Sequence, residues 1–228
     1  VFCRDGWYYA LFNNNLYKMI SPSNKVIVKV KHKYIGNISD LLKRASIQNN
    51  SSVDPTDVVN IVGEVVSVPK TVYDKFGLTG FSCEGIEVGD MAIFSHQVIY
   101  SFNEKTEGGE PMYKNRIWYN GQEYFLADIS LIYAVIRNEE IKMINGYVML
   151  RPFQESKIVL FAGSKIAKGT VKCQIMHIGD SLKNEVPIDA KQGDWAYFNP
   201  MIATKYQINN KPFVIVTQTH ILGVDSAV

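Results

Sequence analysis

The sequence has few cysteines and no long hydrophobic run, and these two shortages exclude whole classes of protein. Its three cysteines, Cys3, Cys83 and Cys173, lie far apart without a CxxC pair, so neither a disulfide framework nor a zinc knuckle is indicated. No apolar stretch approaches the roughly 18 to 20 residues that span a bilayer, and the first residues lack the pattern of a signal peptide. We therefore expect a reducing compartment, no membrane partner and no signal-directed secretion.

The sequence also has no large excess of positive or negative charge and no catalytic motif. The formal net charge is +2 and there is no basic run, so nothing favours a nucleic-acid partner. The sequence contains no nucleophile elbow, phosphate loop, zinc-protease motif or dinucleotide fingerprint. Its histidines are scattered, and a strand would hold Cys173 and His177 too far apart for one metal ion. We predict no enzymatic activity, no cofactor and no metal site.

The composition that remains is that of a globular β protein. Hydrophobic residues make up 46% and charged residues 20% of the chain, which is enough apolar surface for a core. Short β-branched and aromatic runs are broken by Gly, Asn, Asp and Pro, which predicts an all-β fold. One helix is expected at Ile38–Ile47, where apolar residues recur every three or four positions. The expected strands are Lys25–Val30, Gly63–Val68, Asp90–Phe94, Glu123–Ala127, Leu131–Ile136, Gly146–Leu150, Ile158–Phe161, Thr170–Ile178, Asp194–Phe198 and Phe213–Thr217.

An internal repeat organises these strands. Its centre is the shared pattern Gly-Asp-x-Ala-x-Phe, which occurs at 89–94 and again at 193–198, so we expect Phe94 and Phe198 at equivalent buried positions. Three further pairs keep the same order: Lys25–Val28 with Lys157–Leu160, Gly63–Val68 with Gly169–Ile175, and Glu123–Val135 with Pro212–Val224. The repeat predicts an N-terminal arm at 1–23, a first barrel at 24–140 and a second barrel at 141–228.

The two Gly-Asp pairs have a physical explanation as turns. Glycine permits a positive φ, and aspartate can accept hydrogen bonds from the free N–H groups of a turn. Gly89-Asp90 and Gly193-Asp194 are therefore candidate structural turns. Many β-hairpins carry such a pair, so it is the order of the motifs within the repeat that supports a common fold.

The ordered motifs resemble the GroES-like co-chaperonin family. The matching features are Lys-Val-Ile-Val at 25–28, Gly-Glu-Val at 63–65, Val-Gly-Asp-x-x-x-Phe at 88–94, an Arg-Pro at 151–152 and the closing Ile-Leu-Gly-Val at 221–224. The resemblance covers about residues 24–224. It implies two tandem small β-barrels, of a kind that join edge to edge into a ring capping a chaperonin.

In that family, a mobile loop after the first strand carries a Gly-Ile-Val-Leu-like tripeptide that docks on the chaperonin. We expect Ile158–Leu160 to serve as the first strand of the second copy, which leaves too little chain for such a loop. The first copy has the insert Lys31–Asn60, in which Ile38, Leu41 and Leu42 form the only apolar face. This insert is either a solvated loop or an element that orders on a partner.

Two more features exceed a minimal barrel. The arm is rich in aromatic residues, and Trp7, Tyr8, Tyr9 and Phe12 are candidate docking residues, either on their own barrel or on a neighbouring subunit. A polar insert with Gly108-Gly109 and Pro111 spans Asn103–Asn115 and is typical of a projecting loop.

Two functions follow. The preferred hypothesis is a non-enzymatic, oligomeric assembly protein of a bacteriophage virion, a capsid or portal auxiliary, because the second docking loop is expected to be missing and the composition is rich in Asn, Ile, Lys and Tyr. The alternative is a functional co-chaperonin. The partners are accordingly neighbouring subunits or a chaperonin ring, and the location is the virion or the cytoplasm of the bacterial host. Fold alone does not decide between them.

Overall fold

The computed structural model describes residues 2–4, 7–9, 21–32, 60–72, 80–99, 115–152, 170–183, 185–208 and 211–226. The chain divides into two compact units, one made of Val1–Tyr73 with Ser82–Ile132 and the other of Asp74–Phe81 with Tyr133–Val228. No helix in the described part of the chain is long and apolar enough to cross a membrane.

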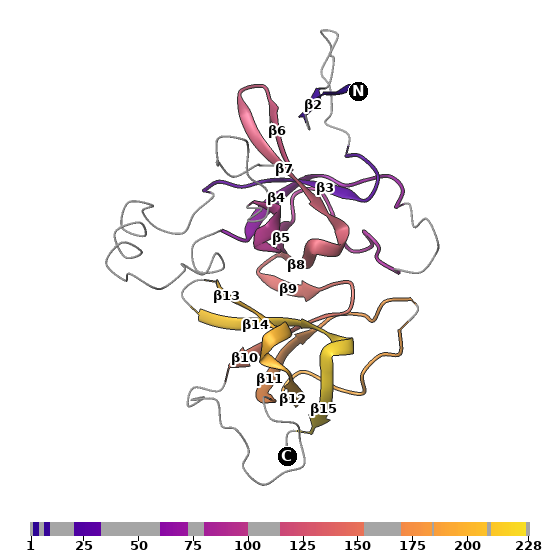
Figure 1. The fold of residues 1–228 in the computed structure, drawn as a ribbon, viewed down its shortest axis with the longest axis vertical. Helices are drawn as coiled ribbons and strands as arrows, with labels where there is room; N and C mark the ends of the chain where they lie inside the picture. Colours follow the sequence, from indigo (N-terminus) through magenta and orange to yellow (C-terminus); the bar gives the residue numbers. More distant parts are fainter. Residues whose placement is uncertain are drawn as a thin grey trace, which may run out of the picture. The chain divides into compact units, whose positions relative to one another are not determined.

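The described residues form β-strands and short 3-10 turns, which confirms the expected all-β fold (Figure 1). The expected helix at 38–47 lies outside these residues. The strands are β1 (Phe2–Arg4), β2 (Trp7–Tyr9), β3 (Lys25–Lys29), β4 (Val62–Ser67), β5 (Met91–Phe94), β6 (Arg116–Tyr119), β7 (Gln122–Asp128), β8 (Ile132–Arg137), β9 (Glu140–Met143), β10 (Tyr147–Pro152), β11 (Val171–Ile178), β12 (Trp195–Phe198), β13 (Thr204–Ile208), β14 (Lys211–Thr217) and β15 (Ile221–Asp225). The 3-10 turns are η2 (His96–Val98), η3 (Ile129–Leu131), η4 (Pro200–Ile202) and η5 (Gln218–His220).

The first large sheet has seven strands in the order β6-β7-β3-β4-β5-β8-β9. Its pairs are antiparallel, with Val26 opposite Ala127 and Gly63 opposite Ala92. Several of these strands bury consecutive residues, as β3 does at Val26, Ile27 and Val28, so both of their faces are covered there, and Phe94 of β5 is 0% exposed. A separate two-stranded sheet joins β1 and β2.

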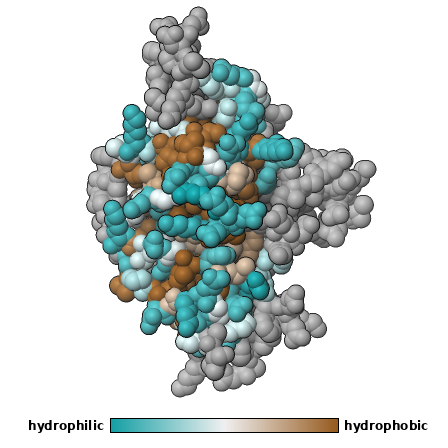
Figure 2. Space-filling view, turned by 180° about the vertical axis from the view of Figure 1, so that it is seen from behind, coloured by the Kyte–Doolittle hydropathy of each residue, from teal (hydrophilic) through white to brown (hydrophobic). Residues whose placement is uncertain are grey.

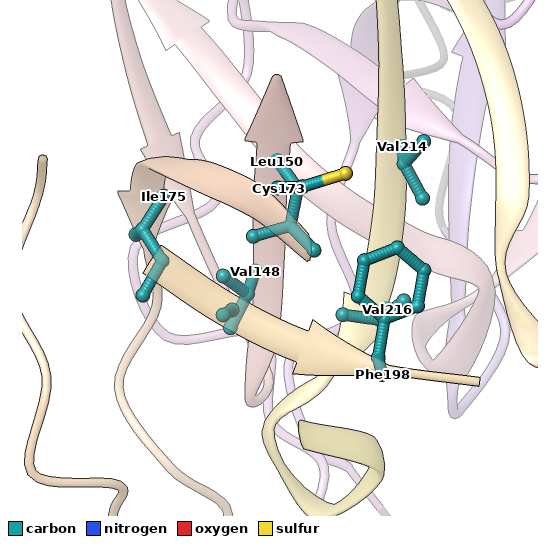
Figure 3. Packing of buried hydrophobic residues seen from close by; sticks show 8 residues of the cluster. Val148, Leu150, Cys173, Ile175, Phe198, Val214 and Val216 are labelled. Atoms are coloured by element: carbon teal, nitrogen blue, oxygen red, sulfur yellow. The ribbon is translucent and has the colours of Figure 1, made fainter. Parts of the chain in front are cut away.

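The second large sheet has six strands in the order β13-β14-β10-β11-β12-β15. Side chains from β10, β11, β12 and β14 converge on one cluster, which Figure 3 shows in close-up. The ring of Phe198 is 2% exposed, so both repeated phenylalanines are buried as expected. The cluster consists of Val148, Leu150, Cys173, Ile175, Ala196, Phe198, Val214 and Val216.

The two large sheets use the same kind of turn after corresponding strands. Ser95 caps η2 by accepting from the N–H of Gln97, and Asn199 caps η4 by accepting from the N–H of Met201. A second 3-10 turn follows the long strand in each sheet, η3 after β7 and η5 after β14. Each sheet therefore runs through the same sequence of strands and turns, in which β5 corresponds to β12, β7 to β14 and β8 to β15.

Candidate partner-docking site

The two Gly-Asp turns have the same geometry in both sheets. Gly89 and Gly193 each have a φ of 98°, which lies in the region that favours glycine. The Asp90 Oδ2 accepts from the N–H of Glu87 at 2.8 Å, and the Asp194 Oδ2 accepts from the N–H of Lys191 at 3.0 Å. Both aspartates are almost fully buried, at 4% and 3% exposed, so each carboxylate holds its turn closed away from water.

The turns also make the same backbone contacts with the preceding strand. Gly89 N–H donates to the Val65 carbonyl at 2.8 Å, and Gly193 N–H donates to the Ile175 carbonyl at 2.8 Å. Val65 therefore corresponds to Ile175, and Gly63 corresponds to Cys173. The expected match of Gly63 with Gly169 is wrong by four residues. That match aligned two identical glycines, whereas the hydrogen bonds between the strands show which residues correspond.

The first strand of the second sheet is β10, and not Ile158–Leu160 as the sequence suggested. Val148 lies opposite Val216 of β14 as Val26 lies opposite Ala127 of β7. The ladder between the first and second strands shifts by a β-bulge at Met149/Leu150, and it shifts at Ile27/Val28 in the other sheet. Arg151 and Pro152 accordingly form the end of this first strand.

This assignment changes where the chain carries a loop. In the seven-stranded sheet, residues 30–61 join the first strand to the second, and in the six-stranded sheet residues 153–170 do so. The ends of the two connections lie at matching ladder positions, since Lys29 is opposite Glu64 and Arg151 is opposite Gln174. The second sheet therefore has a connecting segment at the same position as the first, so the reason for expecting no docking loop there no longer holds, while residues 153–169 themselves lie outside the described residues.

The hydrophobic residues expected to dock lie outside the described residues or at their margin. Ile38, Leu41 and Leu42 belong to the first connection and Ile158–Leu160 to the second, and neither group is described. In the arm, Trp7, Tyr8 and Tyr9 form β2, which pairs with β1, and Phe12 is outside the description. The second connection nevertheless contains Lys157-Ile-Val-Leu-Phe161, which includes the apolar triplet Ile158–Leu160. The residue pattern had suggested a strand for this triplet.

One charged cluster lies on the solvent side of the second sheet. Lys172 Nζ is 3.1 Å from Asp225 Oδ2 and lies 5.2 Å and 5.1 Å from the ring centres of Trp195 and Tyr197. Hydrogen bonds from the Tyr197 hydroxyl, and then from Lys172, lower the pKa of the exposed Asp225 carboxyl. The cluster joins β11, β12 and β15, so it helps to hold β15, the last strand of the sheet, against its neighbours.

The surface drawn in Figure 2 offers no single large apolar patch, because its hydrophobic residues form several areas separated by hydrophilic ones. Isolated hydrophobic residues of this kind are ordinary on a protein surface. Within the described ranges, no group of three His, Cys, Asp or Glu residues could hold a metal ion.

Comparison with known proteins assigns the second half of the chain to a class. Residues 140–224 match the family model of the chaperonin 10 Kd subunit, Cpn10, the co-chaperonin family. These residues therefore form a Cpn10 domain, and they span β9 to β15. The family is not one of enzymes, although the match covers this domain alone. No curated protein matches the chain.

Proposed function

We propose that this chain is a co-chaperonin with two tandem Cpn10 barrels, which caps a chaperonin ring during assisted protein folding. The observation that carries the proposal is the Cpn10 match over residues 140–224. Support for a second copy comes from the seven-stranded sheet, whose turns, caps and bulge recur at corresponding positions of the Cpn10 domain. The boundaries of the two barrels and of the arm belong to this proposal.

The docking element is the connection between β10 and β11. It follows the first strand of the Cpn10 domain, the position at which the co-chaperonin family carries its docking tripeptide, and its sequence supplies Ile158, Val159 and Leu160. The corresponding connection in the seven-stranded sheet supplies Ile38, Leu41 and Leu42 as a competing candidate. A short apolar segment that orders on a groove would gain its affinity from these side chains.

The virion hypothesis loses one of its reasons here. It relied on a missing loop in the second copy. That expectation followed from assigning Ile158–Leu160 as the first strand, and β10 now occupies the first-strand position instead. No comparison supports a capsid or portal role. A co-chaperonin also acts in the compartment of its chaperonin, which for a bacterial or phage protein is the host cytoplasm.

Binding to a nucleotide-loaded chaperonin ring tests the proposal. We expect the unaltered chain to co-elute with the ring, and the triple variant Ile158→Ser, Val159→Ser, Leu160→Ser to lose this binding. The matched control is the triple variant Ile38→Ser, Leu41→Ser, Leu42→Ser, which should still bind. Loss of chaperonin binding in the control alone would show that the docking element lies in the first connection. Failure of the unaltered chain to bind would contradict the co-chaperonin function itself.

A further inference from the structure

The hairpin of β6 and β7 reaches past the strand beside it. β7 pairs with β3 from Phe125 to Asp128, whereas it pairs with β6 from Gln122 to Phe125. The outer half of the hairpin therefore has no third strand of the described residues beside it, and Figure 1 shows this half extending beyond β3. Asn120 and Gly121 form its tip with φ values of 47° and 72°, as in a tight two-residue hairpin turn.

The outer half of this hairpin presents Trp118, which is 59% exposed. Side chains two residues apart on a strand point to the same face, so Trp118 shares a face with Arg116. Directly opposite Arg116 on that face lies Phe125, which is 1% exposed. The face that is buried at the base of the hairpin thus continues past the sheet and ends in a largely uncovered aromatic ring.

An ion pair lies beside this ring. Arg116 Nη1 is 3.4 Å from Glu123 Oε1, and the two side chains are only 22% and 13% exposed. The guanidinium carbon of Arg116 lies 6.0 Å from the centre of the Trp118 ring, at the outer limit of a cation–π contact. The charges next to the ring are therefore paired with each other. A ring supported in this way loses little conformational entropy when a partner binds it.

The hairpin and the first connection leave the seven-stranded sheet at the same end. β3 runs antiparallel to β7, so Lys29 at its end lies beside the residues that lead to the hairpin turn. The connection of residues 30–61 begins there, and a hydrogen bond of 2.9 Å from Asn60 Nδ2 to the His32 carbonyl joins its two ends. The six-stranded sheet has the same arrangement, because β10 runs antiparallel to β14.

The hairpin of β13 and β14 is the counterpart of this hairpin, with different residues at the same positions. In each hairpin these residues form the second pair from the turn, Trp118 opposite Glu123 in one and Gln207 opposite Pro212 in the other. The second hairpin thus has neither the tryptophan nor the glutamate. Its sheet instead has the compact apolar triplet Ile158–Leu160 in the connection at that end. Each sheet therefore has one apolar element at this end, the hairpin in the first and the connection in the second.

We propose that Trp118 is a second anchor on the chaperonin ring, where its ring occupies an apolar pocket of a chaperonin subunit. This inference rests on the proposed co-chaperonin function. Equivalent units of a cyclic assembly present the same end to a partner ring, so the hairpin of one barrel faces the ring as the docking connection of the other does. Tryptophan is the residue type most enriched among binding hot spots. Because the charges beside it are paired, the pocket that receives it is uncharged.

The affinity of the full chain for a nucleotide-loaded chaperonin ring tests this anchor. We expect Trp118→Ala to weaken binding by about tenfold or more, and the matched control Gln207→Ala to bind as the unaltered chain does. Light scattering should give both variants the size of the unaltered chain. Unchanged affinity of Trp118→Ala, or an affinity loss that comes with a change in its own assembly, would overturn this inference alone. Failure of the unaltered chain to bind would overturn the co-chaperonin function and this inference with it.

Photo-crosslinking identifies what the ring of Trp118 touches. A photoreactive benzoylphenylalanine in place of Trp118 should form a covalent bond with a chaperonin subunit when the complex is illuminated. The same group in place of Gln207 should not, because the second hairpin has no anchor at that position. Crosslinks from position 118 only to a second copy of this chain, or only to an unfolded client protein held in the ring, would overturn the proposal, and so would equal crosslinking from both positions.

Discussion

The two large sheets have the same backbone frame with different side chains on it. In the seven-stranded sheet, Gly63 lies opposite Ala92, and a Cβ added to it would lie 3.0 Å from the Lys29 carbonyl oxygen and 3.2 Å from the Phe94 ring. The corresponding position of the six-stranded sheet is the buried Cys173, opposite Ala196. The turns and caps therefore specify the frame, while the packing inside each sheet is adjusted separately.

The positions of the charged cluster differ even more. The six-stranded sheet places Lys172, Tyr197 and Asp225 on adjacent strands, where they form the charged cluster. The corresponding residues of the seven-stranded sheet are Val62, Ile93 and Ile136, which are apolar. An ionic contact is thus not needed to hold this part of the frame. It is a local addition to the Cpn10 domain.

Truncation of the repeated phenylalanines should have the largest effect on both sheets. Phe94→Ala and Phe198→Ala each remove a fully enclosed ring, so each should lower the free energy of unfolding by about 3 to 5 kcal/mol. Urea unfolding of the full chain measures this loss, and the matched Phe→Leu variants should lose less because they leave a smaller cavity. Losses under roughly 1 kcal/mol at both positions would contradict equivalent buried roles.

Substitution of the turn glycines should have a smaller effect, and an equal one in the two sheets. A Cβ added at Gly89 or Gly193 would meet no atom within 4 Å, so the cost of alanine comes from the backbone at a φ of 98°. We expect a loss on the order of 1 to 2 kcal/mol for each substitution. Unequal losses in thermal unfolding would show that the two turns are not equivalent.

Much of this frame could be predicted from the sequence, because local chemistry specifies it. The Gly-Asp turns, the two phenylalanines and most strands follow from patterns a few residues long. The short strand β9 was missed, since Glu140–Met143 is only four residues long. Its role depends on pairing with β8, which a linear pattern does not reveal.

The position of the docking element could not be predicted for a related reason. Lys157–Leu160 resembles Lys25–Val28 more closely in residue type than Val148–Leu150 does. What selects β10 as the strand is its ladder with β14, a segment distant in the sequence. The two apolar triplets Val148–Leu150 and Ile158–Leu160 are similar in residue type, and only pairing with a distant strand distinguishes them.

The smallest expected effect is on the pH dependence of the six-stranded sheet. The lowered pKa of Asp225 means that its contacts stabilise the fold above the ordinary carboxyl pKa, and that this contribution is lost as the pH falls through the folded-state value. Tyr197→Phe removes the largest cause, so the pKa of Asp225 should rise toward its ordinary value in an NMR titration. An unchanged pKa would contradict the contact. The matched change Ile93→Val should leave this titration unaltered.

Amide hydrogen exchange in the full chain tests the common frame most directly. The N–H groups of Val65 and Gly89 donate within one sheet, and those of Ile175 and Gly193 donate at the corresponding positions of the other. All four should exchange as slowly as the central strand amides of their own sheet, because each is held in a ladder or at its turn. Protection of one pair with exchange of the other at the rate of an unfolded chain would contradict the account.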